Sequence, residues 1–188
     1  MAFCYVACDS PDLQQGEIIS DLFEFKLQLT ERKTIDATKE KFIPVSHPYT
    51  IIVSQDCDLE QDYRARTGQI PDDKLVTHVL VCALFTQDEF RNRSRIGSDL
   101  WKRVRQNQDE RYHYLIEATI RDTENNLPEL IADFKTVFSL PTEFVYWLLS
   151  TEQATRRGAL CSPYLEDFMH RLYSFLGRVA TPEISGES

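Results

Sequence analysis

Two short stretches of this sequence combine residue types that could do chemistry. In the first, Ser54-Gln55-Asp56-Cys57-Asp58, two carboxylates flank a thiol directly after an apolar segment. Neighbouring carboxylates raise the pKa of a thiol, so Cys57 is a poor candidate nucleophile. A metal site at Asp56, Cys57 and Asp58 would need a second ligand cluster at a recognised spacing, which the sequence lacks. In the structural alternative, Asp56 or Asp58 accepts hydrogen bonds from backbone amides in a turn while Cys57 packs inward.

The second stretch is a basic segment between residues 91 and 105. Its six basic residues and one acid, Asp99, give it a charge of +5, which leaves −14 on the rest of a chain whose net charge is −9. With an aromatic side chain it predicts a contact surface for an acidic protein partner, for RNA or for a second copy of the chain. The alternative is a solvated helix face. The candidate contact residues are Arg91, Arg93, Arg95, Trp101, Lys102, Arg103 and Arg105.

Length and composition favour one globular domain, expected over residues 1–180 with a flexible tail at 181–188. The longest apolar stretches are too short to span a bilayer. The first residues lack the pattern of a signal peptide, and the five cysteines are odd in number and scattered. We therefore expect a cytoplasmic protein that does not contact a membrane. None of the familiar nucleotide, zinc, calcium or serine-hydrolase motifs is present, so no cofactor is predicted.

Hydrophobic patterning predicts the elements that must position these residues. Strands are expected near residues 16–30, 49–55, 76–86, 111–119 and 130–140. Gly16 supplies a turn before the first of them. The interval 31–48 contains Pro44 and Pro48 and is interpreted as a long loop, and 55–74 as a polar stretch.

Three helical segments complete the prediction. One is inserted at about 87–110, with Ser98 as a cap, and a short one covers 141–150. The last covers about 162–177, with Ser162 as N-cap and Pro163 at the first helical position. Off its apolar stripe lie Tyr164, Tyr173 and Phe175, which either mark an interface or pack on the core.

This order of elements predicts a mainly β protein with helices, of the α+β class, or a small barrel with helical additions. Sequential strands with short connections and helices set apart favour this class, and a parallel sheet with crossover helices would contradict it. The final helix is expected to close the barrel. The predicted core residues are Ile52, Leu80, Val81, Phe134, Val137, Phe168 and Leu172.

Several landmarks in this order resemble the MazF/PemK toxin family of the CcdB/Kid superfamily. They are Gln15-Gly16-Glu17-Ile18, His47-Pro48 before the apolar run 49–54, the stretch 80–87, Ala132-Asp133-Phe134-Lys135-Thr136-Val137, and Arg157-Gly158-Ala159-Leu160. The resemblance is spread over most of the chain. It implies a small SH3-like barrel, usually a homodimer, that cuts single-stranded RNA without a metal. The segments 55–74 and 87–111 are additions to a minimal member of that family.

Two departures fall on the family's site. The resemblance places the catalytic arginine at the position of His47, and of a threonine pair before Gln87 only Thr86 remains, after Phe85. Histidine can do acid–base work near neutral pH but lacks the permanent charge of arginine. His47 with Thr86 is therefore a candidate weakened site, and the alternative is a loop histidine without a role. Arg64, Arg66 and Arg95 are the cations that could rebuild it.

The leading hypothesis is an accessory, partner-binding protein on a toxin-like barrel with a degenerate nuclease site. The resemblance suggests a prokaryotic defence locus, including CRISPR-associated ones, or a toxin–antitoxin locus. The alternative is a working endoribonuclease toxin, with His47, Thr86, Asp56 and Asp58 as candidate catalytic residues. A third hypothesis is a nucleic-acid-binding regulator that uses the basic segment.

Overall fold

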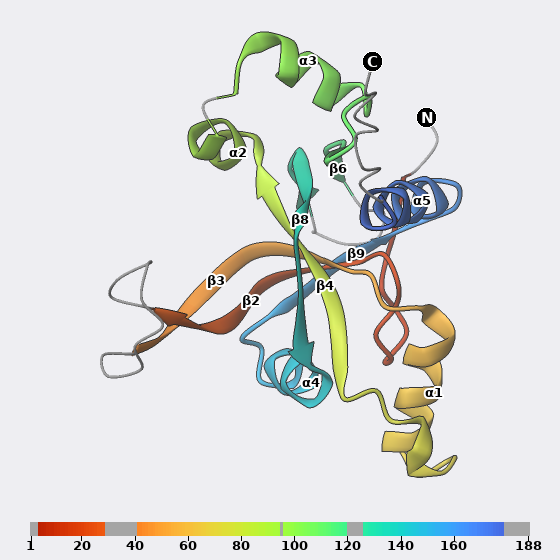
Figure 1. Cartoon of the computed structure of the whole chain (residues 1–188). Coiled ribbons are helices and arrows are strands. Elements are labelled where there is room, and N and C mark those ends of the chain that lie inside the picture. The colour runs from red at the N-terminus through yellow and green to blue at the C-terminus, as the bar shows by residue number, and fades with distance from the viewer. Residues whose placement is uncertain (1–3, 29–40, 95, 120–125, 179–188) are drawn as a thin grey trace, which may run out of the picture.

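The computed structural model describes residues 4–28, 41–94, 96–119 and 126–178 (Figure 1). In chain order the elements are β1 (Tyr5–Val6), β2 (Glu17–Gln28), β3 (Lys41–Ile52), α1 (Asp56–Arg66), the 3-10 turn η2 (Asp72–Lys74), β4 (His78–Thr86), α2 (Gln87–Ser94), α3 (Ser98–Arg105), β5 (Tyr112–Leu115), β6 (Ala118–Thr119), β7 (Asn126–Leu127), β8 (Leu130–Pro141), α4 (Thr142–Ser150), β9 (Thr155–Leu160) and α5 (Tyr164–Leu176). The class is α+β.

A strongly curled, seven-stranded antiparallel sheet organises the molecule as a half-barrel, in the order β1-β9-β2-β3-β4-β8-β5 (Figure 1). Gly16 forms the predicted turn before β2, with φ of +82° and its amide bonded to the Ile52 carbonyl. A Cβ at this position would lie 2.7 Å from Leu165 Cδ1, so glycine also permits the close approach of α5.

Apolar side chains fill both faces of the curled sheet. On one face Phe168, Met169 and Leu172 of α5 pack over Ile18 and Phe134. On the other, α4 and α1 cover a second cluster, which contains Ile19, Leu22, Ile52, Val79, Val81, Leu59, Val145 and Leu148. The final helix therefore docks on the sheet as predicted.

Most predicted core residues are buried, and one prediction is wrong. Ile52, Val81, Phe134, Phe168 and Leu172 are buried, and Val137 is half-buried against the α5 cluster. Leu80, however, is 46% exposed. Side chains alternate along β4, so Leu80 points outward between the inward-facing Val79 and Val81.

The strand predictions near 16–30, 76–86 and 130–140 are confirmed, but the interval 41–48 is not a loop. It forms the first half of β3, which pairs with β2 from Leu22↔His47 to Gln28↔Lys41. β4 joins β3 only at Tyr49 to Ile52. The outer edge of residues 41–47 has no neighbouring strand among the described residues, so Pro44 removes no ladder bond on that side. Of the predicted loop, residues 31–40 lie outside the described residues.

Three segments differ from the sequence predictions. The segment 111–119 contains two short strands, β5 and β6. The helical insertion is two helices, and Gly97 rather than Ser98 precedes α3. α5 begins at Tyr164, so Ser162 is not its N-cap. The predicted tail at 181–188 lies outside the described residues.

Five elements were not predicted: β1, α1, η2, β7 and β9. α1 occupies the first half of the polar stretch 55–74, and β9 occupies residues that were interpreted only as a lead-in to the last helix. β9 is fixed to β2 by a contact of 2.8 Å between Nε of the half-buried Arg156 and Oε1 of the buried Glu17. No helix in the described ranges is both long enough and apolar enough to cross a membrane.

Candidate functional site

His47 lies on β3 with its side chain buried, next to the point where the β2–β3 pair leaves the sheet. Its ring stacks on that of Phe138 with 4.5 Å between the centroids. Its Nε2 atom is 2.8 Å from Oε1 of Glu24, which projects from β2 on the same face of the strand pair. These two neighbours fix the orientation of the His47 ring. A loop histidine without a role would not be expected to have such contacts.

The environment determines the charge of this pair. Burial lowers the pKa of His47, although its hydrogen bond to Glu24 opposes that change. Burial raises the pKa of Glu24, but hydrogen bonds from Lys26 and His47 outweigh it and the net change is downward. Glu24 is then an ionised acceptor, so Nε2 of a neutral His47 carries the proton and Nδ1 keeps a lone pair.

A pocket of about 330 Å³ opens beside His47. Besides His47 and Glu24, its lining includes three cationic side chains, those of Lys26, Arg93 and Lys135. Lys26 is paired with Glu24 at 2.8 Å. Arg93 and Lys135 have no carboxylate oxygen within 4.0 Å among the residues that the structure describes. The pocket thus carries uncompensated positive charge in an acidic chain.

Aromatic rings form part of the wall of this pocket. The Arg93 guanidinium lies 4.4 Å from the centroid of Phe85, and Phe138 carries the stacked His47 ring. Apolar walls weaken the screening of the nearby charges by water. The arrangement suits a small anionic group held between cations and flat apolar surfaces.

The structure gives Thr86 a helix-capping role. Its Oγ1 donates to Glu89 Oε2 at 2.9 Å, and its backbone N–H donates to the same oxygen at 2.9 Å. The Glu89 amide in turn points to Thr86 Oγ1 at 3.4 Å. This reciprocal arrangement is a capping box at the start of α2. Thr86 is not among the residues that line the His47 pocket.

The stretch 54–58 also lies away from that pocket, at the start of α1. Asp56 Oδ1 accepts a hydrogen bond from the backbone amide of Gln15 at 2.5 Å, and not from an amide of the local turn that the structural alternative expected. Asp56 and Asp58 occupy the first helical turn, where carboxylates are favoured by the helix dipole. Cys57 is exposed, so the prediction that it packs inward is wrong. The helix turns its side chain away from Leu59, which is the buried residue of this turn.

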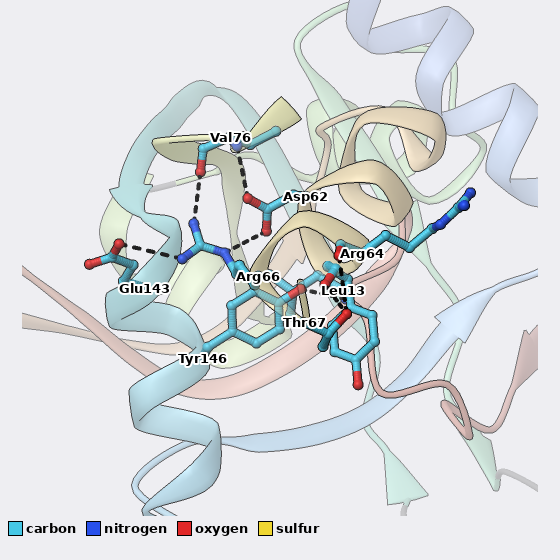
Figure 2. A network of polar contacts seen from close by, with 9 residues as sticks. Leu13, Asp62, Arg64, Arg66, Thr67, Val76, Glu143 and Tyr146 are labelled. Atoms are coloured by element: carbon cyan, nitrogen blue, oxygen red, sulfur yellow. Dashed lines mark hydrogen bonds and ion pairs between the residues drawn. The ribbon is translucent and has the colours of Figure 1, made fainter. Parts of the chain in front are cut away.

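Arg64 and Arg66 do not reach His47, because both lie on α1 and are engaged there. Arg66 is held by the fully buried Asp62, with Nε 2.8 Å from Oδ2, and donates to the Val76 carbonyl at 3.2 Å (Figure 2). It also lies 3.4 Å from Glu143 of α4. Arg64 is 3.8 Å from Glu60. Arg95 lies outside the described residues.

The residues of the basic segment differ in what they contact. Trp101 is half-buried in a third cluster under α2 and α3, with ring contacts to Phe90 and Tyr114. Arg103 pairs with Asp109 at 3.3 Å and Arg105 with Glu129 at 3.6 Å. Arg91 and Lys102 are exposed, and Arg91 lies 5.9 Å from the Trp101 ring. Among the described residues of this segment, only Arg93 lines the His47 pocket.

Sequence reasoning missed most of this pocket. Glu24 and Lys26 come from β2, and their place beside His47 could be known only once 41–47 was recognised as the strand paired with β2; Phe138 comes from β8. The alternation of residues 22–29 placed Glu24 and Lys26 on one face of β2, and this was the available signal. Lys135 lies within a quoted landmark but was not given a role.

The comparisons with known proteins do not extend this description. No protein-family model matches the chain, and none of the curated proteins searched matches it.

Proposed function

We propose that this protein is a non-catalytic, partner-binding protein on a toxin-like barrel, whose His47 pocket holds an acidic group of a protein partner. The observation that carries the proposal is the pair Arg93 and Lys135, which line the pocket of His47 without a carboxylate partner among the described residues. A carboxylate from another protein would supply the missing charge, and the aromatic walls would strengthen its attraction.

The acid–base groups present support binding rather than cleavage. RNA cleavage by the 2′-hydroxyl needs one group to accept a proton and another to give one to the leaving oxygen. A neutral His47 can accept a proton at Nδ1. No second histidine lines the pocket within the described residues, and Glu24 is held in its ionised form. The hydroxyl of Thr86, the other residue of the candidate site, is bonded to Glu89.

The test is a pull-down from the native host with wild-type protein and with Arg93→Glu/Lys135→Glu. We expect the double variant to lose an acidic protein that the wild type recovers. The matched control is Arg64→Glu/Lys74→Glu, which reverses the same number of exposed charges near α1. Equal recovery by all three proteins would refute the proposal.

One observation favours a second candidate, a metal-independent endoribonuclease. The three cations of the pocket, Lys26, Arg93 and Lys135, could stabilise the charge of a phosphorane beside a neutral histidine. The test is incubation of the purified protein with mixed single-stranded RNA. The leading proposal expects no cleavage above that of His47→Ala. Cleavage that disappears in His47→Ala but persists in Thr86→Ala would establish the second candidate at this pocket.

A further inference from the structure

Beyond the sheet, β2 and β3 continue as a two-stranded arm formed by residues 22–28 and 41–47, with no third strand beside them in the part of the chain that the structure describes (Figure 1). β9 pairs with β2 only at Glu17–Ser20, and β4 pairs with β3 only at Tyr49–Ile52. An isolated pair of strands is marginally stable in water unless one of its faces is covered.

The two faces of the arm differ in chemistry. Residues directly opposite each other in an antiparallel pair project to the same side. The pairings Phe23↔Ser46, Phe25↔Pro44 and Leu27↔Phe42 therefore define one face, on which none of these six residues is charged. The other face carries Glu24, Lys26 and His47 and leads into the pocket described above.

The uncharged face of the arm is continuous with α4. The ring of Phe23 contacts that of Phe25 at 5.7 Å and that of Phe144 at 5.1 Å, and Phe144 stacks on Trp147 at 5.8 Å. The outer members remain open to solvent: Phe25 is 60% exposed, Leu27 43%, Phe42 72% and Trp147 48%. We call these four residues with Phe23 and Phe144 the arm patch.

We propose that the arm patch is the interface between two copies of this chain. A large aromatic side chain can bury roughly 150–250 Å². Scaled by their exposed fractions, the three open aromatic side chains and Leu27 together present roughly 450 Å² of apolar surface. A stable interface buries about 800 Å² on each partner, of which about 57% is apolar. The arm patch thus supplies about the apolar share that one side of a dimer requires.

The lack of charge on this face of the arm favours a second copy of the chain over an acidic partner as its occupant. The acidic group assigned above needs the cations of the opposite face, whereas an apolar patch finds a matching surface in its own copy. Two such patches can meet about a twofold axis, where the same residues contribute from both sides. The pockets around His47 then remain open, one on each copy.

The experiment is sedimentation velocity over a range of concentrations with wild-type protein and with Phe25→Ser/Phe42→Ser. We expect a dimer that the double substitution weakens by at least about 100-fold, because buried aromatic side chains dominate interface energies. The matched control is Ile116→Ser/Leu176→Ser, which removes two exposed apolar side chains outside the arm patch and should leave the dimer unchanged. Circular dichroism checks that each variant is folded.

A second measurement uses wild-type protein alone, so it tests the proposal even if the double variant fails to fold. Hydrogen exchange of wild-type amides in residues 22–27 and 42–47 should slow as the protein concentration rises, while exchange in α1 should not change. A wild type that is monomeric at all concentrations, or a folded double variant that dimerises as tightly, would overturn the proposal. Binding to a different protein through the arm patch by a monomeric chain would overturn it as well.

Discussion

Single side chains that look reactive in this sequence turn out to be of two kinds. Thr86 and Asp56 hold backbone amides, and His47 belongs to a pocket with an ordered partner. The difference lies in what each polar atom touches, which residue type and spacing cannot reveal. Thr86 with Glu89 does match the capping-box spacing, so its role could have been inferred from the sequence.

Thr86 provides a direct test of this distinction. Thr86→Ala should lower the free energy of unfolding by about 1 kcal/mol, because the α2 capping box loses its side-chain oxygen. Partner recovery by the folded variant should equal that of wild type. Urea denaturation of wild type, Thr86→Ala, Glu89→Ala and the double variant gives a double-mutant cycle for the free energy of unfolding. Fully additive losses would contradict the reciprocal cap, since the two side chains act together.

A second residue-scale prediction concerns His113 of β5. It is buried between Phe134 and Phe168, and burial together with the nearby charge of Arg171 lowers its pKa to about 3. The folded state therefore binds fewer protons than the unfolded state, where the pKa is about 6.5. The contribution to stability is full above pH 6.5 and is lost as the pH falls toward 3, by about 2 kcal/mol between pH 6.5 and pH 5.

Urea denaturation at these two pH values checks that prediction. His113→Phe should show a smaller loss of stability on acidification than wild type, since its ring cannot be protonated. His170→Gln, at an exposed position on α5, should lose as much as wild type. An unchanged pH dependence in His113→Phe would show that other groups account for the acid sensitivity.

At the scale of elements, sequence periodicity correctly predicted the helices and strands that bury one face and expose the other. The stripe of Phe168, Met169 and Leu172 identified α5, and the apolar runs identified the central strands. α1 was missed because it buries little apart from Leu59, Ala65 and Asp62. Its acidic first turn and basic last turn were the remaining helix signal. Residues 41–48 were missed because prolines are normally taken as evidence against a strand.

The docking of α5 gives the first element-scale prediction. Leu172→Ala should cost about 2–5 kcal/mol, because Leu172 is buried in the cluster over β8 and a cavity would remain. Tyr173→Ala, one position along the helix and 50% exposed, should cost far less. Thermal denaturation compares the two variants. Similar melting temperatures for both would show that α5 does not dock through this stripe.

The buried Asp62 gives the second element-scale prediction. Asp62 joins α1 to the segment just before β4 by accepting a hydrogen bond from the Val76 amide at 2.8 Å, and Arg66 extends the contact to Glu143 of α4 (Figure 2). Asp62→Ala should cost about 3–5 kcal/mol, because Arg66 loses the buried partner that compensates its charge. Asp58→Ala, in the exposed first turn of α1, is the control. Chemical denaturation in which both variants match wild type would contradict this role.

At the scale of the whole molecule, the α+β class could be predicted, but the order of the strands and the shape of the sheet could not. Curling and the projecting arm depend on where each pairing stops, at Ser20 for β9 and at Tyr49 for β4. Such limits are set by contacts between distant segments. The same contacts bring Arg93, Lys135 and His47 to one pocket, so the candidate site could not be assembled from spacing alone.

Whole-molecule charge leads to the last prediction. With a net charge of −9, the chain repels acidic partners everywhere except near exposed cations, so association with one should be steered locally. Its rate should be high at about 0.01 M salt, where charges act over about 30 Å, and should fall steeply toward about 0.15 M, where they act over about 8 Å. Stopped-flow measurements with the partner recovered by the wild type give this slope. Arg93→Glu/Lys135→Glu should flatten or invert the salt dependence, whereas Arg64→Glu/Lys74→Glu should reduce it only slightly. A wild-type rate that is independent of salt would exclude electrostatic capture at the pocket.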